Sequence, residues 1–464
     1  MKSNNQGRPF MAVAMAVVLL AALSLVPWNR LTNGVLKDFN LLSQIFADGT
    51  SELQATATEP VDPGLEHALA ELDEEHEDAA DTAAHDGTDD FYDNFSVPVS
   101  DGKVMMEDYT RDRAGAVNLR AALARGRKAR IAVIGDSYIE GDIFTQHVRE
   151  MLQKRLGGSG VGYMPMYSEL TGFRTSVRQI CRNWKESDIR KAGGNRFNWL
   201  AGEYFVAEPG ASTTFRGSSR LAGLSSWDNT RILYLADEPG SISIGTDSGE
   251  YSFEVSPSED VAVAEVPGTT STASVTTTVP GLVVLGAFLD GTGGIQVDNM
   301  SLRGNSGLTH RKLNIDLAAR MRAHVDYDMV VIEYGINALT SQQKEYSGYS
   351  RILGQIIDRV RQCYPDADIV MMGIGDRGQK INGNVASLPT APAMVRAQRD
   401  AARRKGVIFW DTRAAMGGEN SVVDWRDRGL INADYIHLNA KGGKELARLF
   451  VDALDCTLYP PSHK

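Results

Sequence analysis

Two kinds of hydrophobic pattern alternate in the sequence beyond residue 100. Residues 129–134 are a short, β-branched run, which predicts a buried strand. A helix is predicted over 142–156, with one apolar face made by Phe144, Val148, Met151 and Leu152. A strand followed directly by a helix is typical of a parallel α/β unit. Apolar positions near the start of this region also predict a helix within 103–125.

The same alternation returns in the C-terminal third of the chain. Strands are predicted at 329–334, 368–373 and 407–411, and helices at 346–364, 391–405 and 440–454. We therefore expect a doubly wound α/β domain with a parallel sheet, whose first part is 101–164 and whose second part is 301–464.

Residues 165–300, between these two parts, have a different pattern. Short β-type runs at 213–215, 231–235, 241–244, 251–255, 273–279 and 283–289 are separated by Gly, Pro, Asp and Ser. Spacing of about ten residues predicts an inserted antiparallel β-sandwich. We expect this β-rich insert to resemble a carbohydrate-binding domain. Two interpretations remain open for its tryptophans, a sugar-stacking surface or core packing: Trp184, Trp199 and Trp227.

The N-terminus begins with a segment suited to a membrane. Residues 10–26 are apolar or small and carry no charge, with Lys2 and Arg8 before them and Trp28 after. This run is short for a bilayer span but longer than most signal-peptide cores. We expect 1–28 to be a signal anchor, a transmembrane helix with its positively charged end inside the cell. Cleavage at Ala22-Leu23-Ser24 is the alternative.

The acidic charge of the chain is confined to one segment. The formal net charge is −11, yet residues 51–100 hold 15 Asp and Glu and no Lys or Arg, and the rest holds 48 basic and 44 acidic residues. Residues 29–100 are therefore predicted to be a disordered acidic linker, either a spacer or a solubilising tail. The remainder has no single-sign field, so we expect no nucleic acid partner.

One serine follows the first predicted strand, within Gly135-Asp136-Ser137. A serine at a strand-to-helix corner lies at the carboxyl edge of a parallel sheet, where open α/β folds bind ligands. The helix amino terminus there favours developing negative charge. The same three residues also occur in ordinary turns, so the motif needs partners elsewhere in the chain.

A base for this serine is available in Asp434-Tyr435-Ile436-His437, just before the last predicted helix. Serine needs a base within hydrogen-bond reach, and that base needs a third group to orient it. An Asp three residues before a His can hold one ring nitrogen while the other faces the serine. His437 is the best candidate of the eight histidines, although the pair could also be a capping Asp and a surface His.

Acyl transfer also needs hydrogen-bond donors for the oxyanion. Gly335-Ile336-Asn337 follows the strand at 329–334, and a block from Arg303 to Gly307 follows the β-rich region. Glycine gives an uncluttered backbone N–H, and asparagine gives an NH₂ group. Each block alone is also a common turn.

In this order, and at strand ends, the four blocks resemble the SGNH (GDSL-type) hydrolases. The resemblance covers 129–164 and 301–454. It implies Ser137 as nucleophile and as a backbone oxyanion donor, Gly304 as a second backbone donor, with Gly307 as its alternative, Asn337 as the side-chain donor, His437 as base and Asp434 as its orienting partner. The sequence departs from the family at Ala338, where an Asp is frequent, and we treat Asp136 as structural. No cofactor and no metal are expected.

An exported SGNH domain with a β-rich insert resembles bacterial enzymes that act on acetylated envelope glycans, such as peptidoglycan O-acetylesterases. The expected function is a serine esterase that removes O-acetyl groups, with an acetylated glycan or small ester as substrate. The alternatives are an O-acetyltransferase with the same triad, a lipase or thioesterase, and a non-catalytic glycan-binding scaffold.

For a bacterial protein, these expectations place the chain in the inner membrane as a single-pass protein, with its catalytic domain in the periplasm. A cleaved signal would make it periplasmic or secreted. Cys181, Cys363 and Cys456 lack metal-ligand spacing, and either one disulfide with a spare thiol or three buried free thiols would fit them.

Overall fold

A six-stranded sheet is the centre of the computed structural model, which describes residues 62, 64–77, 91–92, 95–169, 174–188, 196–381 and 384–459. In spatial order its strands are β14 (Ile295–Ser301), β4 (Ala129–Gly135), β15 (Met329–Glu333), β16 (Asp368–Met372), β19 (Ile408–Trp410) and β3 (Glu107–Asp108). All neighbours are parallel except β3, which pairs antiparallel with β19 at one edge.

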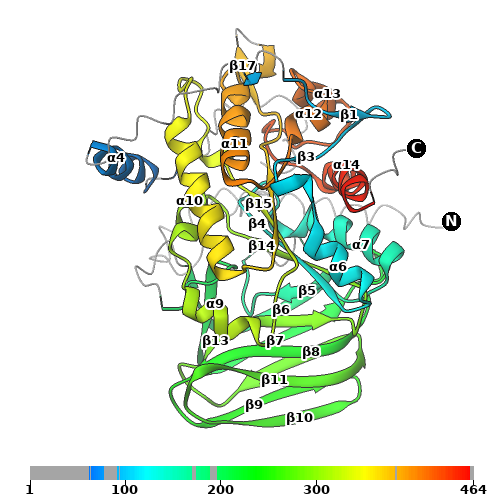
Figure 1. Ribbon diagram of the computed structural model, residues 1–464. Coiled ribbons are helices and arrows are strands. Elements are labelled where there is room, and N and C mark those ends of the chain that lie inside the picture. Colours follow the sequence, from blue (N-terminus) through cyan, green and yellow to red (C-terminus); the bar gives the residue numbers. More distant parts are fainter. Residues whose placement is uncertain are drawn as a thin grey trace, which may run out of the picture. The chain divides into compact units, whose positions relative to one another are not determined.

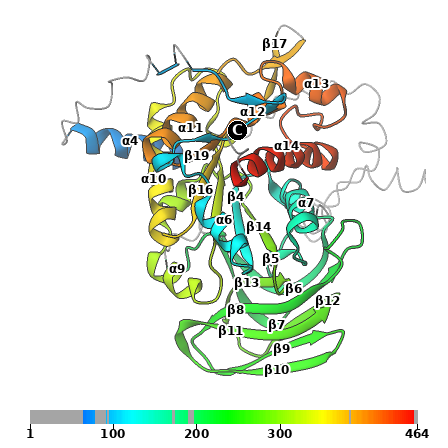
Figure 2. The same cartoon turned by 45° about the vertical axis from the view of Figure 1, so that its right-hand side comes forward.

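Helices cover both faces of this sheet, as the sequence predicts. Successive side chains of a strand point to opposite faces, so Ile131 and Val133 enter one hydrophobic core while Ala132 and Ile134 enter the other. The first face is covered by α6 (Val117–Ala124), α7 (Thr145–Leu156) and α14 (Ala440–Leu458), and the second by α9 (Ile315–Arg322), α10 (Ser347–Cys363) and α11 (Ala391–Lys405), as Figures 1 and 2 show.

The helix expected within 103–125 is much shorter than that range. This stretch instead forms β2 (Lys103–Val104), the edge strand β3, a 3₁₀ turn and then α6. Gly115 has φ +63°, which a right-handed helix does not allow, so the helix begins only at Val117.

Strand β14 corrects the boundary expected for the β-rich insert. The insert was expected to cover 165–300, which includes most of β14. This strand instead pairs with β4 along its whole length, from Ile295 opposite Ala129 to Ser301 opposite Gly135. Its polar residues are buried yet paired, since Asp298 binds Arg130 at 2.6 Å and Asn299 donates to the Ile139 carbonyl at 2.9 Å. These partners are distant in sequence, so the pattern of β14 alone does not indicate a core strand.

A nine-stranded antiparallel sheet lies between β4 and β14 in chain order. Its strands are β5 (Gly162–Met164), β6 (Val177–Asp188), β7 (Glu203–Gly217), β8 (Trp227–Ala236), β9 (Gly240–Thr246), β10 (Gly249–Val255), β11 (Ser258–Thr270), β12 (Thr272–Thr277) and β13 (Val283–Asp290). The long β7 pairs with β13 at its start and with β12 at its end, so the two sheets expected of a sandwich are joined in one forked sheet. Three tryptophans, Trp184, Trp199 and Trp227, are buried, which favours core packing over a sugar-stacking surface.

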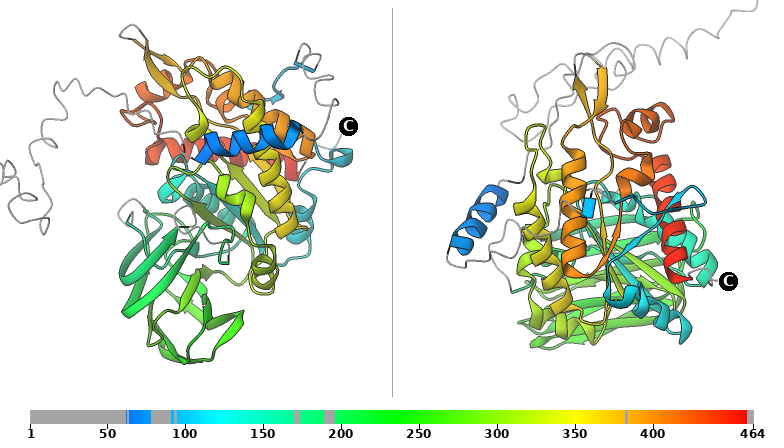
Figure 3. Two further views of the ribbon diagram at one scale, coloured as in Figure 1. Left: turned by 90° about the vertical axis from the view of Figure 1, so that its left-hand side faces the viewer. Right: turned by 45° about the horizontal axis from the view of Figure 1, so that its top comes forward.

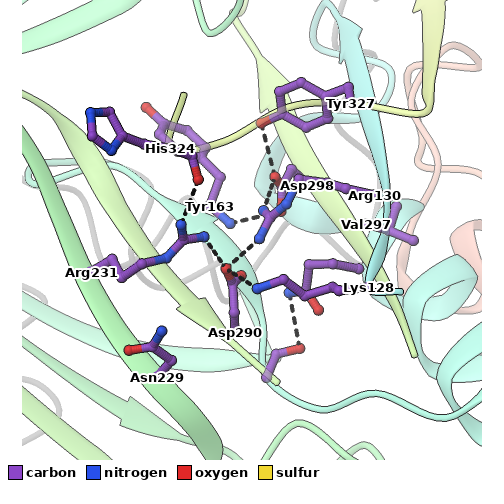
Figure 4. Close-up of polar contacts among 12 residues, drawn as sticks. Lys128, Arg130, Tyr163, Asn229, Arg231, Asp290, Val297, Asp298, His324 and Tyr327 are labelled. Carbon is purple, nitrogen blue, oxygen red and sulfur yellow. Dashed lines mark hydrogen bonds and ion pairs between the residues drawn. The ribbon is translucent and has the colours of Figure 1, made fainter. Parts of the chain in front are cut away.

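A buried charge cluster joins the two sheets (Figure 4). Asp290 at the end of β13 forms ion pairs with Lys128, Arg130 and Arg231. Burial alone would raise the pKa of Asp290, but these cations, Arg130 most strongly, hold it at about 2. Asp298 of β14 accepts a second bond from Arg130 and one from the Tyr327 hydroxyl at 2.9 Å. Because an unpaired buried charge is costly, the cluster fixes one relative placement of the two sheets.

Part of the expected linker is folded against the domain. Helix α4 (Gly64–Glu77) buries Leu65, Ala68 and Leu72 in the core that also holds α10, and Figure 3 shows the two helices side by side. The apolar spacing i, i+3, i+7 is helical, and the acidic composition around it conceals this signal. Farther along, the Tyr92 ring lies beneath the Arg396 guanidinium and its hydroxyl donates to Asp400 at 2.7 Å.

The remaining expectations concern the N-terminal segment and the cysteines. Residues 10–26, and the anchor expected there, lie outside the described residues. Within the part of the chain that the structure describes, no helix is both long enough and apolar enough to span a bilayer. Cys181, Cys363 and Cys456 are free thiols, as the second of the two expectations has it, but only Cys363 is buried.

Candidate active site

Ser137 lies in the turn that follows β4, at the carboxyl edge of the parallel sheet. Gly135 ends that strand, and a Cβ there would lie 2.8 Å from the Glu333 carbonyl oxygen on neighbouring β15, so the turn requires glycine. The Asp136 carboxylate accepts the Tyr138 N–H at 2.9 Å, which closes the turn around the serine. Ser137 is consequently held on a rigid element.

Asp434 and His437 come together with Ser137 across 300 residues of sequence. They lie in the loop between α13 (Ser421–Asp427) and α14. One oxygen of Asp434 accepts the backbone N–H groups of Ile436 and His437 at 2.9 and 3.0 Å, and the other contacts His437 Nδ1 at 2.8 Å. His437 Nε2 lies 2.9 Å from Ser137 Oγ.

The contact with Asp434 determines which ring nitrogen of His437 acts as acceptor. Burial by itself raises the pKa of Asp434, but hydrogen bonds from the His437 ring and from two backbone amides outweigh it, so the pKa lies below its ordinary value. An ionised carboxylate accepts only, which places the imidazole proton on Nδ1. Nε2 is then an acceptor aimed at the Ser137 hydroxyl, the arrangement that a general base needs.

Asn337 lies in a 3₁₀ turn (Ile336–Ala338) directly after β15, and is almost fully buried. Its Nδ2 atom donates to Asp136 Oδ2 at 2.9 Å and to the Asn305 carbonyl at 3.2 Å. Asp136 thus supports Asn337 where the sequence has Ala338 in place of an acidic residue. The structural role expected for Asp136 is confirmed, and it extends to this second loop.

Gly304 and Gly307 differ in what their backbone N–H groups do. The Gly307 N–H donates to Asn305 Oδ1 at 2.9 Å, so it is not available to a ligand. The Gly304 N–H makes no hydrogen bond to any residue that the structure describes. Gly304 has φ +70°. Of its two neighbours, Arg303 lines a cavity over Ser137 and the Asn305 carbonyl accepts a hydrogen bond from Asn337. This contrast favours Gly304 as the backbone donor.

A cavity of about 540 Å³ opens over the serine and histidine. Its walls include Gly141, Ile143, Thr175 and Arg303. Arg303 forms an ion pair with Glu140 at 2.5 Å, beside the opening. The sequence did not point to either Glu140 or Arg303 as a residue of the site, although Arg303 directly precedes Gly304. Among the described residues, no group of three or more His, Cys, Asp or Glu is placed to hold a metal ion.

Comparison with known proteins agrees with this geometry. Residues 268–444 match the model of the GDSL-like lipase/acylhydrolase family; this stretch contains Gly304, Asn337, Asp434 and His437 and begins after Ser137. No curated protein matches the sequence.

Several solved structures are similar to the chain. A peptidoglycan O-acetylesterase aligns with a TM-score of 0.64 at 23% identity, covering 77% of this chain and 99% of its own, which shows a shared fold. A Bacillus subtilis protein aligns at 13% identity over 65% and 99% of the two chains, with a TM-score of 0.30. A family two carbohydrate esterase from Cellvibrio japonicus aligns at 10% identity over 61% and 98%, with a TM-score of 0.27.

Proposed function

We propose that the chain is a serine ester hydrolase of the SGNH (GDSL-type) family, which the family match over residues 268–444 supports. It removes O-acetyl groups from cell-envelope polysaccharide or peptidoglycan through an acyl-serine intermediate. The observation that carries the mechanism is the continuous hydrogen-bond chain from Ser137 Oγ through His437 to Asp434, at 2.9 and 2.8 Å. The choice of an acetylated glycan is supported by the fold shared with a peptidoglycan O-acetylesterase.

In the proposed mechanism, His437 Nε2 takes the proton of Ser137 as Oγ attacks the acetyl carbonyl carbon. The tetrahedral intermediate carries a negative oxygen, which the backbone N–H groups of Ser137 and Gly304 and the Nδ2 group of Asn337 stabilise. The carbon–oxygen bond to the sugar then breaks, and His437 returns the proton to the leaving sugar oxygen. This leaves acetyl-Ser137.

Deacylation repeats the same steps with water. His437 removes a proton from a water molecule, whose oxygen attacks the acetyl carbonyl, and acetate leaves as Ser137 Oγ regains the proton. The ionised Asp434 keeps the imidazole in the required orientation through both halves and stabilises the imidazolium ion that forms in each.

The test is acetate release by the full-length chain from 4-nitrophenyl acetate and from O-acetylated glycans. Ser137→Ala is expected to lower kcat by about 10⁴-fold or more, because nucleophile and base act as a unit. Ser252→Ala, an exposed serine on β10, is the matched control and should keep full activity. Full activity of Ser137→Ala would contradict the mechanism, and release of longer acyl chains in preference to acetate would contradict the substrate class.

We further propose that residues 10–26 anchor the enzyme in a bacterial inner membrane, with the catalytic domain in the periplasm. The apolar run and the preceding Lys2 and Arg8 support this placement. The full chain is expected in the carbonate-washed membrane fraction. A charged pair in the apolar run, Leu19→Arg with Leu20→Arg, should abolish that association. A mature N-terminus beyond residue 24 would instead show a cleaved signal peptide.

A further inference from the structure

A second cavity, of about 320 Å³, adjoins the one over Ser137. The two share Glu140, Gly141 and Arg303 in their walls, so a single ligand can occupy both. The second cavity lies between the two sheets. One side is the carboxyl end of β14, with Asn299 and Ser301, and the other is made by β5, β6 and β7 of the antiparallel sheet.

The alternation of β6 explains which of its side chains reach this cavity. Val177 and Gln179 are two residues apart and therefore lie on the same face. The pairing with β7 is interrupted at Asn183, which has φ +56°. Beyond this irregularity Trp184 is buried, and Glu186, two residues later, lines the cavity. Before Asn183 the odd-numbered side chains of β6 face the cavity, and after it the even-numbered ones do. The interruption is thus what directs Glu186 into the cavity.

The charged side chains of this cavity are mainly carboxylates, which are hydrogen-bond acceptors. Two cations line it, Arg174 and Arg303. Four carboxylates also line it, those of Glu140, Glu169, Glu186 and Glu203. The Tyr163 hydroxyl donates to Glu203 at 3.1 Å, which fixes the position of that carboxylate at the first residue of β7. Carboxylates accept hydrogen bonds from hydroxyl groups and repel anions. The excess of carboxylates therefore disfavours an anionic ligand and fits a ligand with several hydrogen-bond donors, such as the hydroxyl groups of a sugar.

The size and position of the cavity further restrict the class of ligand that it can bind. Its volume is at the lower end of the roughly 300–1,000 Å³ typical of small-molecule sites, and it opens beside the ester-cleaving serine instead of on a remote face. A ligand group held here must be joined to the group whose ester is cleaved. In a glycan, that group is the sugar next to the acetylated one.

We propose that this second cavity is a substrate subsite that binds a neutral, hydroxyl-bearing sugar next to the sugar whose acetyl group enters the Ser137 cavity. The proposal rests on the proposed esterase function and assigns Glu186 and Glu203 as specificity-determining residues. The antiparallel sheet then takes part in substrate selection through its acidic edge, and not through a tryptophan platform.

The test compares two substrates of the full-length enzyme, 4-nitrophenyl acetate and an O-acetylated chito-oligosaccharide of several sugars. 4-Nitrophenyl acetate has no sugar to place in the subsite. In Glu186→Ala and Glu203→Gln, the ratio of kcat/KM for the oligosaccharide to kcat/KM for 4-nitrophenyl acetate is expected to fall about tenfold, mainly through a higher KM, as the loss of hydrogen bonds worth about 1.4 kcal/mol would give. Glu254→Gln, exposed on β10 of the same sheet, is the matched control and should leave the ratio unchanged.

The outcomes separate the two proposals. An unchanged ratio in both variants, or an equal loss on both substrates, would overturn the subsite while leaving the esterase intact. Activity of the unaltered enzyme on 4-nitrophenyl acetate without any on the oligosaccharide would overturn the subsite and also the glycan substrate of the proposed function, and would leave only a serine esterase. Absence of activity on every acetyl ester would overturn the proposed function itself.

Discussion

Asp136 connects the turn that carries Ser137 to the loop that carries Asn337. One of its oxygens accepts the Tyr138 N–H and the other accepts Asn337 Nδ2, both at 2.9 Å. An aspartate can accept at both oxygens, whereas an asparagine in its place has a single acceptor oxygen. Replacing one carboxylate oxygen of Asp136 by an NH₂ group therefore tests how Asn337, the proposed oxyanion donor, is positioned.

We predict that Asp136→Asn lowers kcat by at least about tenfold while KM changes little. The new NH₂ group must face either the Tyr138 N–H or Asn337 Nδ2, so one donor is left against another donor. The loss should be smaller than the roughly 10²–10³-fold cost of removing an oxyanion donor outright. Steady-state kinetics on 4-nitrophenyl acetate provide the measurement.

The control for this change is Asp427→Asn, an exposed aspartate at the end of α13. It should retain the kinetic constants of the unaltered enzyme. If Asp136→Asn raised KM and left kcat intact, Asp136 would act in binding and not in positioning Asn337.

The residues of the site were predictable from sequence to the extent that each ends a strand or precedes a helix. Ser137, Asn337 and His437 are all of this kind, and parallel strands bring such ends together at one edge. The contact between Asp136 and Asn337 was not predictable, because it depends on the side-chain directions of two loops 201 residues apart. The family resemblance already gave Gly304 with Gly307 as its alternative, and the bond from the Gly307 N–H to Asn305 Oδ1 supports that choice.

Among the elements, α11 and β14 mark the two extremes of prediction. Helix α11 has the predicted bounds because its apolar spacing is regular and Gly406, with φ +60°, ends it. Strand β14 was not predicted as a strand, and most of it fell within 165–300, the range expected for the insert, although it pairs with β4. Its buried Asp298 and Asn299 resemble loop residues until their distant partners are known.

Helix α4 is the element whose attachment is most open to test. Its hydrophobic contact with the domain is made by a few side chains, among them Leu72, which is 3% exposed. Just before the helix, Asp62 accepts the Ser306 hydroxyl at 2.6 Å and donates its N–H to the Asn337 carbonyl at 3.3 Å. The start of the acidic segment is therefore held next to the loops of the candidate active site.

We predict that Leu72→Ala releases α4 from the domain. Replacing a buried leucine by alanine lowers the stability of the folded state by about 2–5 kcal/mol. This loss is large compared with the free energy by which a few contacts hold one short helix to the domain. Amide hydrogen exchange should become faster across 64–77 while the central sheet remains protected. Glu66→Ala, exposed on the same helix, should leave exchange unchanged. Equally fast exchange of these amides in the unaltered protein would contradict the docked helix.

For the molecule as a whole, the contact between the antiparallel sheet and the α/β domain was the part that sequence did not reveal. The charge cluster around Asp290 and the second cavity both lie between the sheets, and each combines residues from separate segments of the chain. His310, in a 3₁₀ helix (Leu308–Lys312) before α9, belongs to the same junction. Its Nε2 lies 2.9 Å from the Leu200 carbonyl, and its Nδ1 lies 3.2 Å from the Tyr334 hydroxyl.

His310 should make the stability of the whole protein depend on pH. Burial lowers its pKa from 6.5 to about 4, because the charged imidazolium loses its hydration there. Between these values the unfolded chain binds a proton that the folded protein does not. The free energy of unfolding therefore falls as the pH is lowered through this window, by up to about 3 kcal/mol from this one group.

The expected signature is a difference between variants, since other groups also titrate on acidification. His310→Gln has no imidazole to protonate, so its free energy of unfolding in urea should decline less steeply than that of the unaltered protein between pH 6.5 and pH 4. His67→Gln, whose side chain is 80% exposed, should follow the unaltered protein throughout. Parallel curves for His310→Gln and the unaltered protein would mean that His310 is protonated in the folded state. In that case the junction between the sheets would have to accommodate a buried charge at acidic pH.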